Sequence, residues 1–385
     1  MGSALSSEKE TLPISERRPV PYYGMTVPPE ASKAPQDSQD FYDEFVEEAY
    51  GLPHRDGKNV IICRPTRPDE IPKRPETWAD DWALKNLMEV YKLVGEDAHP
   101  RIVRYVGALE GDSVGLVVEK LWPGPLRYLT LPVMPVPVPK FDAISRNDRL
   151  LLSLYYLWAL QALSAMTFFH SRSICIRNFS RRHVWIRSDY SLAITGFISA
   201  APLHDQSENE EKQEKNGFPF GYPLIIPEED FDLELRDDDV HSMPSFKADL
   251  FRWATFVWRL MTNDFCAHSR SSFERWEPVT PMTGDPFLNS GRDVLRINIE
   301  RREKNLFQQL KEERLGTILV NAWSGRYNAA EEVAQAVKAE AQKIGIEVVG
   351  DEIAIGEAWE NIFEVVQRGK LLHDRELRFR AFDRD

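Results

Sequence analysis

Apolar residues recur with the period of a helix between Trp78 and Val94. Spacings of three and four residues place them on one face, and a helix buries such a face against a core. The predicted core face consists of Trp82, Leu84, Leu87, Val90, Tyr91 and Val94. The pattern therefore predicts one amphipathic helix in the first third of the chain.

Short apolar runs flank this helix and predict strands. Residues 59–63 (NVIIC) precede the helix, and residues 101–109 (RIVRYVGAL) and 114–121 (VGLVVEKL) follow it on either side of a turn. Runs of this length that are rich in Val and Ile are typical of strands. Phe41–Tyr50 (FYDEFVEEAY) is predicted to be a short amphipathic helix. We expect a small sheet with one main helix.

A long apolar stretch runs from Leu150 to Phe169 (LLLSLYYLWALQALSAMTFF). It has the roughly 20 residues that a membrane-spanning helix needs. Ser153, Gln161 and Ser164 interrupt it, however, and a helix that is apolar nearly all round also suits the centre of a large globular domain. We therefore expect a buried core helix and no transmembrane segment.

The rest of the chain is predicted to be mainly helical. Helices are expected at residues 147–170, 246–262, 300–314 and 329–344, with a short β-rich stretch at Cys175–Ser199. Asn328 and Glu331 have the spacing of a capping box, and Gly345 lies where a helix ends. A further helix is expected around Ile353–Val366, followed by a charged tail.

Composition divides the chain into four parts. Residues 1–40 are rich in Pro, Ser and Glu without an apolar period, so we expect a flexible N-terminal arm. Residues 41–121 form the β-rich half. A proline-rich hinge opens the larger helical half, residues 122–345, and residues 346–385 form a C-terminal helical extension with its charged tail.

Charge and cysteine content limit the partners and the compartment. Sixty-one acidic and 48 basic residues leave a net charge of −13, which argues against nucleic-acid binding. Three cysteines far apart predict no disulfide framework and favour a reducing environment. No secretory leader is recognised, so we expect an intracellular, cytoplasmic protein, with the nucleus left open. Gly2 fits the loose N-myristoylation pattern, and a single acyl chain would give only weak membrane association.

Five segments resemble a eukaryotic protein kinase in a fixed order. His99–Gly107 (HPRIVRYVG) is similar to the run that follows the helix of a kinase small lobe, and Gly115–Leu126 is similar to the fifth strand and hinge. Ala162–Ser199 resembles the catalytic and metal-binding loops, Lys247–Thr262 the central large-lobe helix, and Leu315–Tyr327 the last helices. The resemblance covers about residues 50 to 345, which makes it more specific than any single motif.

The resemblance implies an α+β, bilobal protein-kinase-like fold, with a small β-rich N-lobe and a larger, mainly helical C-lobe. It places Asp249 at a buried anchoring aspartate and His170 at a histidine that bonds loop backbone. Arg177 corresponds to an arginine that often holds a phosphate on the activation segment. Glu228 lies in an Ile-Pro-Glu similar to the end of that segment, with Arg326 as its candidate salt-bridge partner.

Residues at the catalytic positions of the resemblance differ from those of kinases. Asn178 stands where the catalytic aspartate would accept the substrate proton, and an amide cannot do so. His183 takes the place of the metal-holding asparagine. Gly196 takes that of the metal-binding aspartate, at the family's usual spacing from Asn178. Phosphoryl transfer depends on positioning and charge neutralisation by these groups, so the resemblance implies no catalysis.

The small-lobe positions have changed as well. The strand lysine should fall at Cys63 or Arg64, and no glycine-rich motif precedes that strand. By its spacing from Tyr91, the helix glutamate falls nearer Leu87 than Glu89. The sequence therefore leaves the glutamate that would pair with such a lysine unassigned.

A degenerate nucleotide cleft remains a candidate site. Glu119 and Leu121 fall where a kinase hinge meets adenine, and Phe197 follows the altered metal-binding position. Gly196 offers Mg²⁺ no carboxylate and His183 is a poor replacement, so Mg²⁺-dependent binding is not expected. We expect no metal site and no required cofactor, and ATP binding stays open.

The resemblance implies a pseudokinase that acts as a scaffold or allosteric interaction module through protein partners. Two alternatives stay open: a divergent kinase or phosphotransferase that binds ATP, and a nucleotide-binding module that needs no metal. Acidic residues between Gly196 and Pro227 offer carboxylates that could replace a phosphate opposite Arg177. The competing interpretation of this segment is an exposed, flexible loop.

Overall fold

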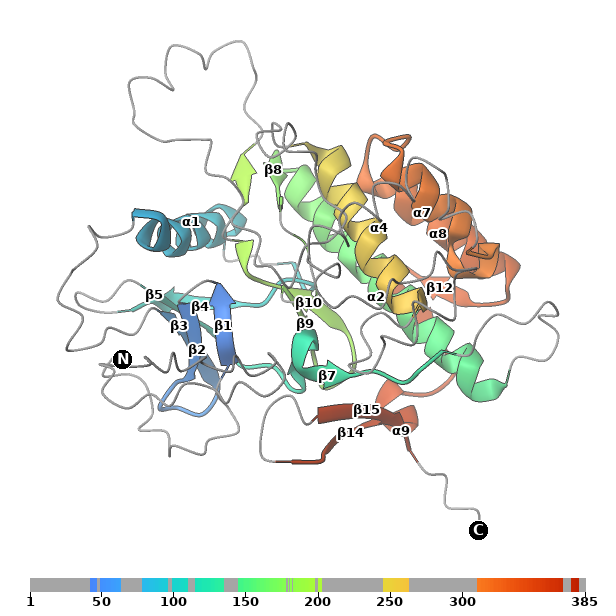
Figure 1. The fold of residues 1–385 in the computed structure, drawn as a ribbon, viewed down its shortest axis with the longest axis horizontal. Helices are drawn as coiled ribbons and strands as arrows, with labels where there is room; N and C mark the ends of the chain where they lie inside the picture. The colour runs from blue at the N-terminus through green and yellow to red at the C-terminus, as the bar shows by residue number, and fades with distance from the viewer. Residues whose placement is uncertain are drawn as a thin grey trace, which may run out of the picture.

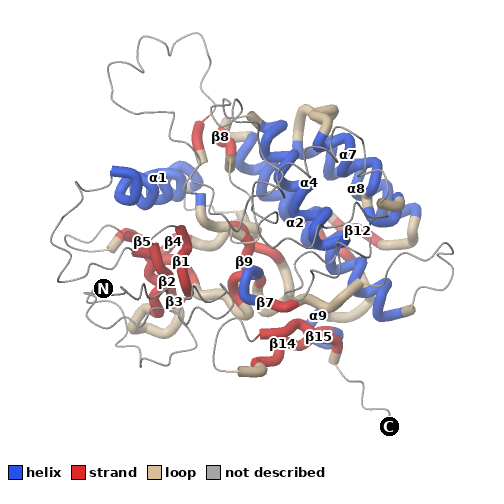
Figure 2. The backbone as a smooth tube through the Cα atoms, viewed as in Figure 1, coloured by secondary structure: helices blue, strands red, loops and turns tan. Residues whose placement is uncertain are grey.

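The structure is a computed structural model that mixes helices with small, mainly antiparallel sheets (Figure 1). It describes residues 42–46, 49–63, 78–95, 99–109, 115–134, 145–177, 179, 181, 183–197, 200–202, 245–262, 310–369 and 375–380. Figure 2 shows the larger helices α2, α4, α7 and α8 grouped on one side and strands β1 to β5 on the other. The expected mixture of α and β structure is confirmed.

A five-stranded sheet with the strand order β1-β2-β3-β5-β4 forms the β-rich side. The strands are β1 (Tyr42–Val46), β2 (Ala49–Pro53), β3 (Asn59–Cys63), β5 (Gly115–Glu119) and β4 (Tyr105–Ala108). The helix predicted over Phe41–Tyr50 is wrong, because this segment forms β1 and the start of β2. In the structure Tyr42 pairs with Gly51 and Val46 pairs with Ala49, so the two strands are antiparallel neighbours.

Helix α1 (Trp78–Val94) packs against this sheet, and its bounds confirm the predicted helix. Leu84, Leu87, Val90, Tyr91 and Val94 are all buried, as their spacing predicts. They belong to one apolar cluster with Val60 and Ile62 of β3. One face of the sheet therefore shares its core with α1.

Helix α2 (Arg146–His170) is the centre of the helical side. Ser145 caps its N-terminus by accepting a hydrogen bond from the Asp148 N–H at 3.1 Å. By length and composition α2 could span a bilayer, but 89% of its most apolar window is buried inside the protein. The prediction of a core helix is confirmed. Around it lie α4 (Phe246–Thr262), α7 (Gly316–Trp323) and α8 (Ala330–Lys343).

Helix α8 confirms its predicted position but not its predicted cap. Ala329 is the N-cap residue, and the backbone N–H of Asn328 donates to the carboxylate of Glu332 at 2.9 Å. Glu331 therefore has no part in the cap, whereas Gly345 takes the expected positive φ of 77° at the end of the helix. Of the helix predicted at residues 300–314, only the 3-10 turn η9 (Glu312–Arg314) and two preceding residues lie in the described part.

Short strands connect the two sides. Strands β10 (Leu192–Ile194), β9 (Val184–Ile186) and β6 (Gly124–Pro125) form one small sheet, and β8 (Ile174–Cys175) pairs with β11 (Ala201–Pro202). The predicted β-rich stretch at Cys175–Ser199 is therefore confirmed. The 3-10 turn η2 (Leu126–Tyr128) continues from β6 to β7 (Leu129–Thr130).

The C-terminal extension is mainly β structure, so the helix predicted around Ile353–Val366 is wrong. Its elements are β12 (Glu347–Val349), β13 (Glu352–Ala354), α9 (Trp359–Ile362), β14 (Phe363–Gln367) and β15 (Arg375–Phe379). Gly350 and Gly356 both have positive φ, which favours turns over a continuous helix. Each turn directs the following residues into a separate short element.

Strand β15 ties the extension to the hinge. It pairs in parallel with β7, aligning Arg375 with Leu129. The guanidinium of Arg375 is buried, donates to the Pro123 carbonyl at 2.7 Å, and lies 4.4 Å from the centre of the Trp122 ring. The extension is thus part of the folded core and covers the residues that follow β5.

Candidate functional site

The loop after β8 is held by a buried carboxylate from α4. Asp249 is fully buried, and its two oxygens accept hydrogen bonds from the backbone N–H groups of Ile176 and Arg177, each at 2.7 Å. Hydrogen bonds to a charged acceptor are stronger than bonds between neutral groups. The aspartate therefore fixes the backbone of the loop, which is the anchoring role that the resemblance implies for Asp249.

His170 completes this anchor from the end of α2. Its Nε2 lies 3.1 Å from the Asp249 carboxylate, and its ring stacks on Phe246 at a centroid distance of 4.1 Å. An ionised carboxylate only accepts, so Nε2 carries the proton in this contact. The structural role expected for His170 fits this position, but its partner is a side chain and not loop backbone.

Arg177 has an unusual backbone conformation. Its φ is +62°, in the left-handed region that costs a non-glycine residue about 1–3 kcal/mol. The bond from its N–H to Asp249 helps to hold this conformation. Burial and the charge of nearby Arg252 lower the pKa of the Arg177 guanidinium. The acidic residues predicted to face Arg177 lie outside the described part of the chain, as do Asn178, Glu228 and Gly2.

The two positions that would hold metal in a kinase pack against each other. Gly196 has a φ of +75°, and a Cβ atom added to it would lie within 3.0 Å of His183 Cδ2. His183 is buried, at 5% exposure, and its carbonyl accepts from the Thr195 N–H at 2.8 Å. The ring therefore occupies the space that a side chain at position 196 would need.

Phe197 lies in an aromatic core and not on an open wall. It contacts Phe169 at a centroid distance of 4.6 Å and Tyr91 edge-on at 5.5 Å. The Tyr91 hydroxyl and Thr195 Oγ1 are 2.9 Å apart. Burial, together with the charge of Glu119, raises the pKa of Tyr91 well above its usual range, so the phenol stays neutral. This cluster joins α1 to the residues around Gly196.

Glu119 and Leu121, the candidate adenine contacts, are engaged within the protein. The Glu119 carboxylate accepts from the Arg104 N–H and from the Arg187 guanidinium, both at 2.8 Å. The Glu119 N–H itself donates to the Arg104 carbonyl at 3.0 Å. Leu121 is 6% exposed and belongs to the main core. Both side chains are thus engaged within the protein, whereas the resemblance places the adenine contact on the backbone of these residues.

The structure separates Cys63 from α1. Cys63 clusters with Ile61 on one face of β3, whereas Ile62 shares the opposite face and its core with Leu87 of α1. Ile62, which faces the helix, is thus apolar. Arg64 lies outside the described residues. Glu89 pairs with Lys92 at 2.6 Å on the exposed side of α1.

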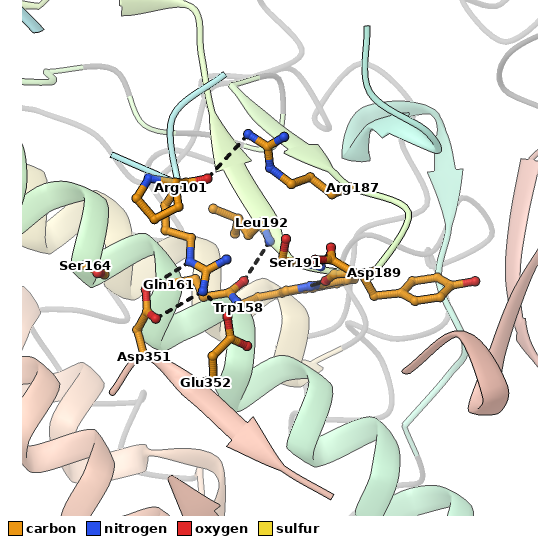
Figure 3. A network of polar contacts seen from close by, with 12 residues as sticks. Arg101, Trp158, Gln161, Ser164, Arg187, Asp189, Ser191, Leu192, Asp351 and Glu352 are labelled. Atoms are coloured by element: carbon orange, nitrogen blue, oxygen red, sulfur yellow. Dashed lines mark hydrogen bonds and ion pairs between the residues drawn. The ribbon is translucent and has the colours of Figure 1, made fainter. Parts of the chain in front are cut away.

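A second polar cluster, which sequence reasoning missed, joins four segments that are distant in sequence (Figure 3). Arg101 donates to both carboxylate oxygens of Asp351, at 2.9 and 3.1 Å, and also pairs with Glu352. Gln161 of α2 donates to Glu352 at 3.3 Å and accepts from the Leu192 N–H at 2.7 Å. Gln161 within an apolar helix was the signal available in the sequence, because a buried amide needs partners.

Electrostatics within this cluster favour the ion pair. Burial acts to raise the pKa of Asp351, but the hydrogen bonds and charge of Arg101 outweigh it and lower the pKa. The same pair raises the pKa of Arg101 against the effect of burial. Both side chains therefore stay charged at neutral pH and hold the segment before β4 to the C-terminal extension.

The described residues offer little for metal chemistry. They contain no group of three or more His, Cys, Asp or Glu side chains that could hold a metal ion. Arg326, the proposed partner of Glu228, donates to the Asn321 side chain at 2.9 Å. The observed feature of the site is thus the loop that Asp249 anchors.

No protein-family model matches the chain. A search of curated proteins also finds no match.

Proposed function

We propose that this chain is a protein-kinase-like domain that has lost phosphoryl transfer and acts as a pseudokinase, a non-catalytic interaction module. The proposal combines the ordered sequence resemblance with the geometry of the loop that follows β8. Its role would be to present a fixed surface to protein partners inside the cell. A fold hosts many functions, so the argument rests on the site and not on the fold alone.

Three features of the architecture support a kinase-like domain. The five-stranded antiparallel sheet carries α1 on one face, and the helical side is built around α2 and α4, in the chain order that the resemblance implies. Asp249 reaches from α4 to the backbone of the triplet that replaces the kinase catalytic triplet. Strand β8 precedes the region that holds this triplet and Gly196, and β11 follows it. The antiparallel pairing of β8 with β11 brings the two ends of the region together.

The contact between His183 and Gly196 carries the non-catalytic part of the proposal. A kinase needs an oxygen ligand from each of these positions to hold Mg²⁺ beside the phosphates. Here one position has no side chain, and the ring at the other fills the space beside it. Even a conformational change of the loop would supply no carboxylate at position 196. The sequence loss at Asn178 removes the proton acceptor as well.

Nucleotide titration followed by thermal unfolding tests the proposal. A ligand at 100 times its Kd stabilises a protein by about 2.7 kcal/mol. For a domain of this size that corresponds to a rise of several degrees in Tm. We expect no rise with ATP, with or without Mg²⁺. Asp189→Asn, a change in an exposed turn, is the matched control and should behave identically.

The other outcomes separate the alternatives. A rise in Tm that does not need Mg²⁺ would favour a metal-independent nucleotide-binding module. A rise that needs Mg²⁺, together with transfer of labelled phosphate from ATP to any acceptor, would overturn the proposal. A His183→Ala variant that abolished such transfer would place the activity at this site.

A further inference from the structure

Hydrogen bonds at both ring nitrogens fix the protonation state of His99. Its Nδ1 accepts from the Arg101 N–H at 3.2 Å, so Nδ1 carries no proton. Its Nε2 lies 3.2 Å from the hydroxyl of Ser164 on α2. That hydroxyl also bonds to Asp351, and an ionised carboxylate only accepts, so Ser164 donates its one proton there. Ser164 then accepts from Nε2, which makes His99 the neutral Nε2–H tautomer.

The same turn positions Arg101, which holds the C-terminal extension. The guanidinium of Arg101 reaches Asp351 and Glu352 where the chain turns from β12 into β13 (Figure 3). The Arg101 carbonyl accepts from the Ile194 N–H at 2.8 Å, which fixes the other side of its backbone. The position of Arg101 therefore depends in part on the bond that its N–H donates to His99.

This arrangement disfavours a second proton on the ring of His99. A protonated Nδ1 would be a donor that faces the N–H of Arg101, which is also a donor. Burial lowers the pKa of His99, and the charges of Arg101 and Arg172 act in the same direction, against the opposing charge of Asp351. Arg187 donates to the next carbonyl of the turn at 3.4 Å. Burial and three nearby cations thus favour the neutral ring, and one carboxylate opposes them.

We propose that His99 is an acid-sensitive latch for the C-terminal extension. The neutral ring keeps Arg101 within bonding distance of Asp351 and Glu352. Protonation removes the Nδ1 acceptor, frees the turn at Arg101 and raises the population of a state in which the β12–β13 hairpin has opened. Local openings of this kind occur in folded proteins, and this one responds to pH. The latch does not depend on whether the domain is a pseudokinase.

Proton linkage gives the direction and the size of the effect. A histidine whose folded pKa is lowered contributes stability that is complete above its ordinary pKa of about 6.5 and is lost in acid. When the ring titrates at that ordinary pKa in the open state and stays neutral in the closed state, the open state gains up to about 25-fold between pH 7 and pH 5. The pKa of Asp351 is lowered from an ordinary value of about 4, so this carboxylate titrates in a separate, more acidic window.

Hydrogen exchange at pH 7 and pH 5, corrected for the intrinsic pH dependence of amide exchange, measures the opening. We expect exchange of the β12–β13 amides to rise by about 10- to 25-fold in the unaltered protein at pH 5. His99→Asn keeps a neutral side-chain acceptor for the Arg101 N–H but takes up no proton. The rise should therefore disappear in this variant, at whatever level its exchange begins at pH 7.

His54 provides a matched control. Its Nδ1 also accepts from a backbone N–H two residues later, that of Asp56 at 3.3 Å, in the turn between β2 and β3. His54→Asn should therefore keep the full rise in the β12–β13 hairpin. The amides of α4 serve as an internal reference, because global unfolding would raise their exchange to the same extent.

NMR of the unaltered protein, with isotope-labelled histidine ring nitrogens, tests the tautomer directly. We expect His99, identified by the signal lost in His99→Asn, to show the neutral Nε2–H form at pH 7. The Nδ1–H tautomer or an imidazolium at pH 7 would overturn the proposal. So would a full pH-dependent rise in His99→Asn, or an equal rise in α4. If His99→Asn does not fold, His99→Gln, which keeps a neutral donor toward Ser164, takes its place.

Discussion

Adding one methyl group at Gly196 tests the packing of His183 against this position. Gly196→Ala places a Cβ in the space occupied by the His183 ring, in a backbone with a φ of +75°. Two separate penalties follow. An L-residue in the left-handed region costs roughly 1–2 kcal/mol, and overpacking a well-filled interior adds about 1–3 kcal/mol. We expect a total loss of about 2–5 kcal/mol of unfolding free energy.

Gly95 supplies a matched control for the backbone term. Its φ is +78°, and nothing lies within 4 Å of an added Cβ. Gly95→Ala should therefore lose only the roughly 1–2 kcal/mol that belongs to the left-handed conformation. The excess loss at Gly196 measures the clash alone, since the effect of alanine on the unfolded chain is common to both.

Removing the ring should remove the clash. In a His183→Ala background, Gly196→Ala should cost no more than Gly95→Ala, giving a coupling of about 1–3 kcal/mol between the two positions. Urea denaturation with an unchanged m-value provides the free energies. Equal losses for the two glycine variants, or no coupling in the double-mutant cycle, would refute the claim that the imidazole fills the space beside Gly196.

Three further predictions concern buried polar groups. Asp249→Asn should lose about 2–4 kcal/mol in urea denaturation, because it weakens two backbone hydrogen bonds, whereas Asp189→Asn should stay within about 0.5 kcal/mol. Asp351→Asn should lower stability at pH 7, and the difference should vanish as the pH falls from about 4 through the lowered folded pKa, since the contribution of a carboxyl with a lowered pKa is lost in acid. Arg375→Met should lose about 1–3 kcal/mol by thermal or urea unfolding, while Arg378→Met, at an exposed pair, should lose at most about 1 kcal/mol. Similar losses for Arg375 and Arg378 would contradict the assigned role of the hinge contact.

Much of the fold could be predicted from local pattern. The helices at Trp78–Val94 and Phe246–Thr262 have their expected bounds. Apolar residues that recur every three to four positions over such a length lie on one face only in a helix. The errors at Phe41–Tyr50 and Ile353–Val366 fall on shorter, mixed segments. There, pairing with another strand decides the conformation, as β1 shows by pairing with β2 and β14 by pairing with β15.

The site was predictable in part. The resemblance pointed to Asp249 as an anchoring residue, and the structure shows its carboxylate bound to the backbone of Ile176 and Arg177. The packing of His183 against Gly196 was not predictable, because each residue alone looks only like a missing ligand. The ion pair of Arg101 with Asp351 joins residues 250 positions apart, and no spacing rule connects them.

The parallel pairing of β15 with β7 has a consequence for how this protein is made. Arg375 aligns with Leu129, so β7 leaves the ribosome long before its neighbour exists. At synthesis rates of about 5–20 residues per second, that delay is on the order of tens of seconds. Contacts of such long sequence separation also form slowly. The apolar surface of α2 that β13 and α8 later cover is exposed meanwhile, which makes the nascent chain a natural client for chaperones.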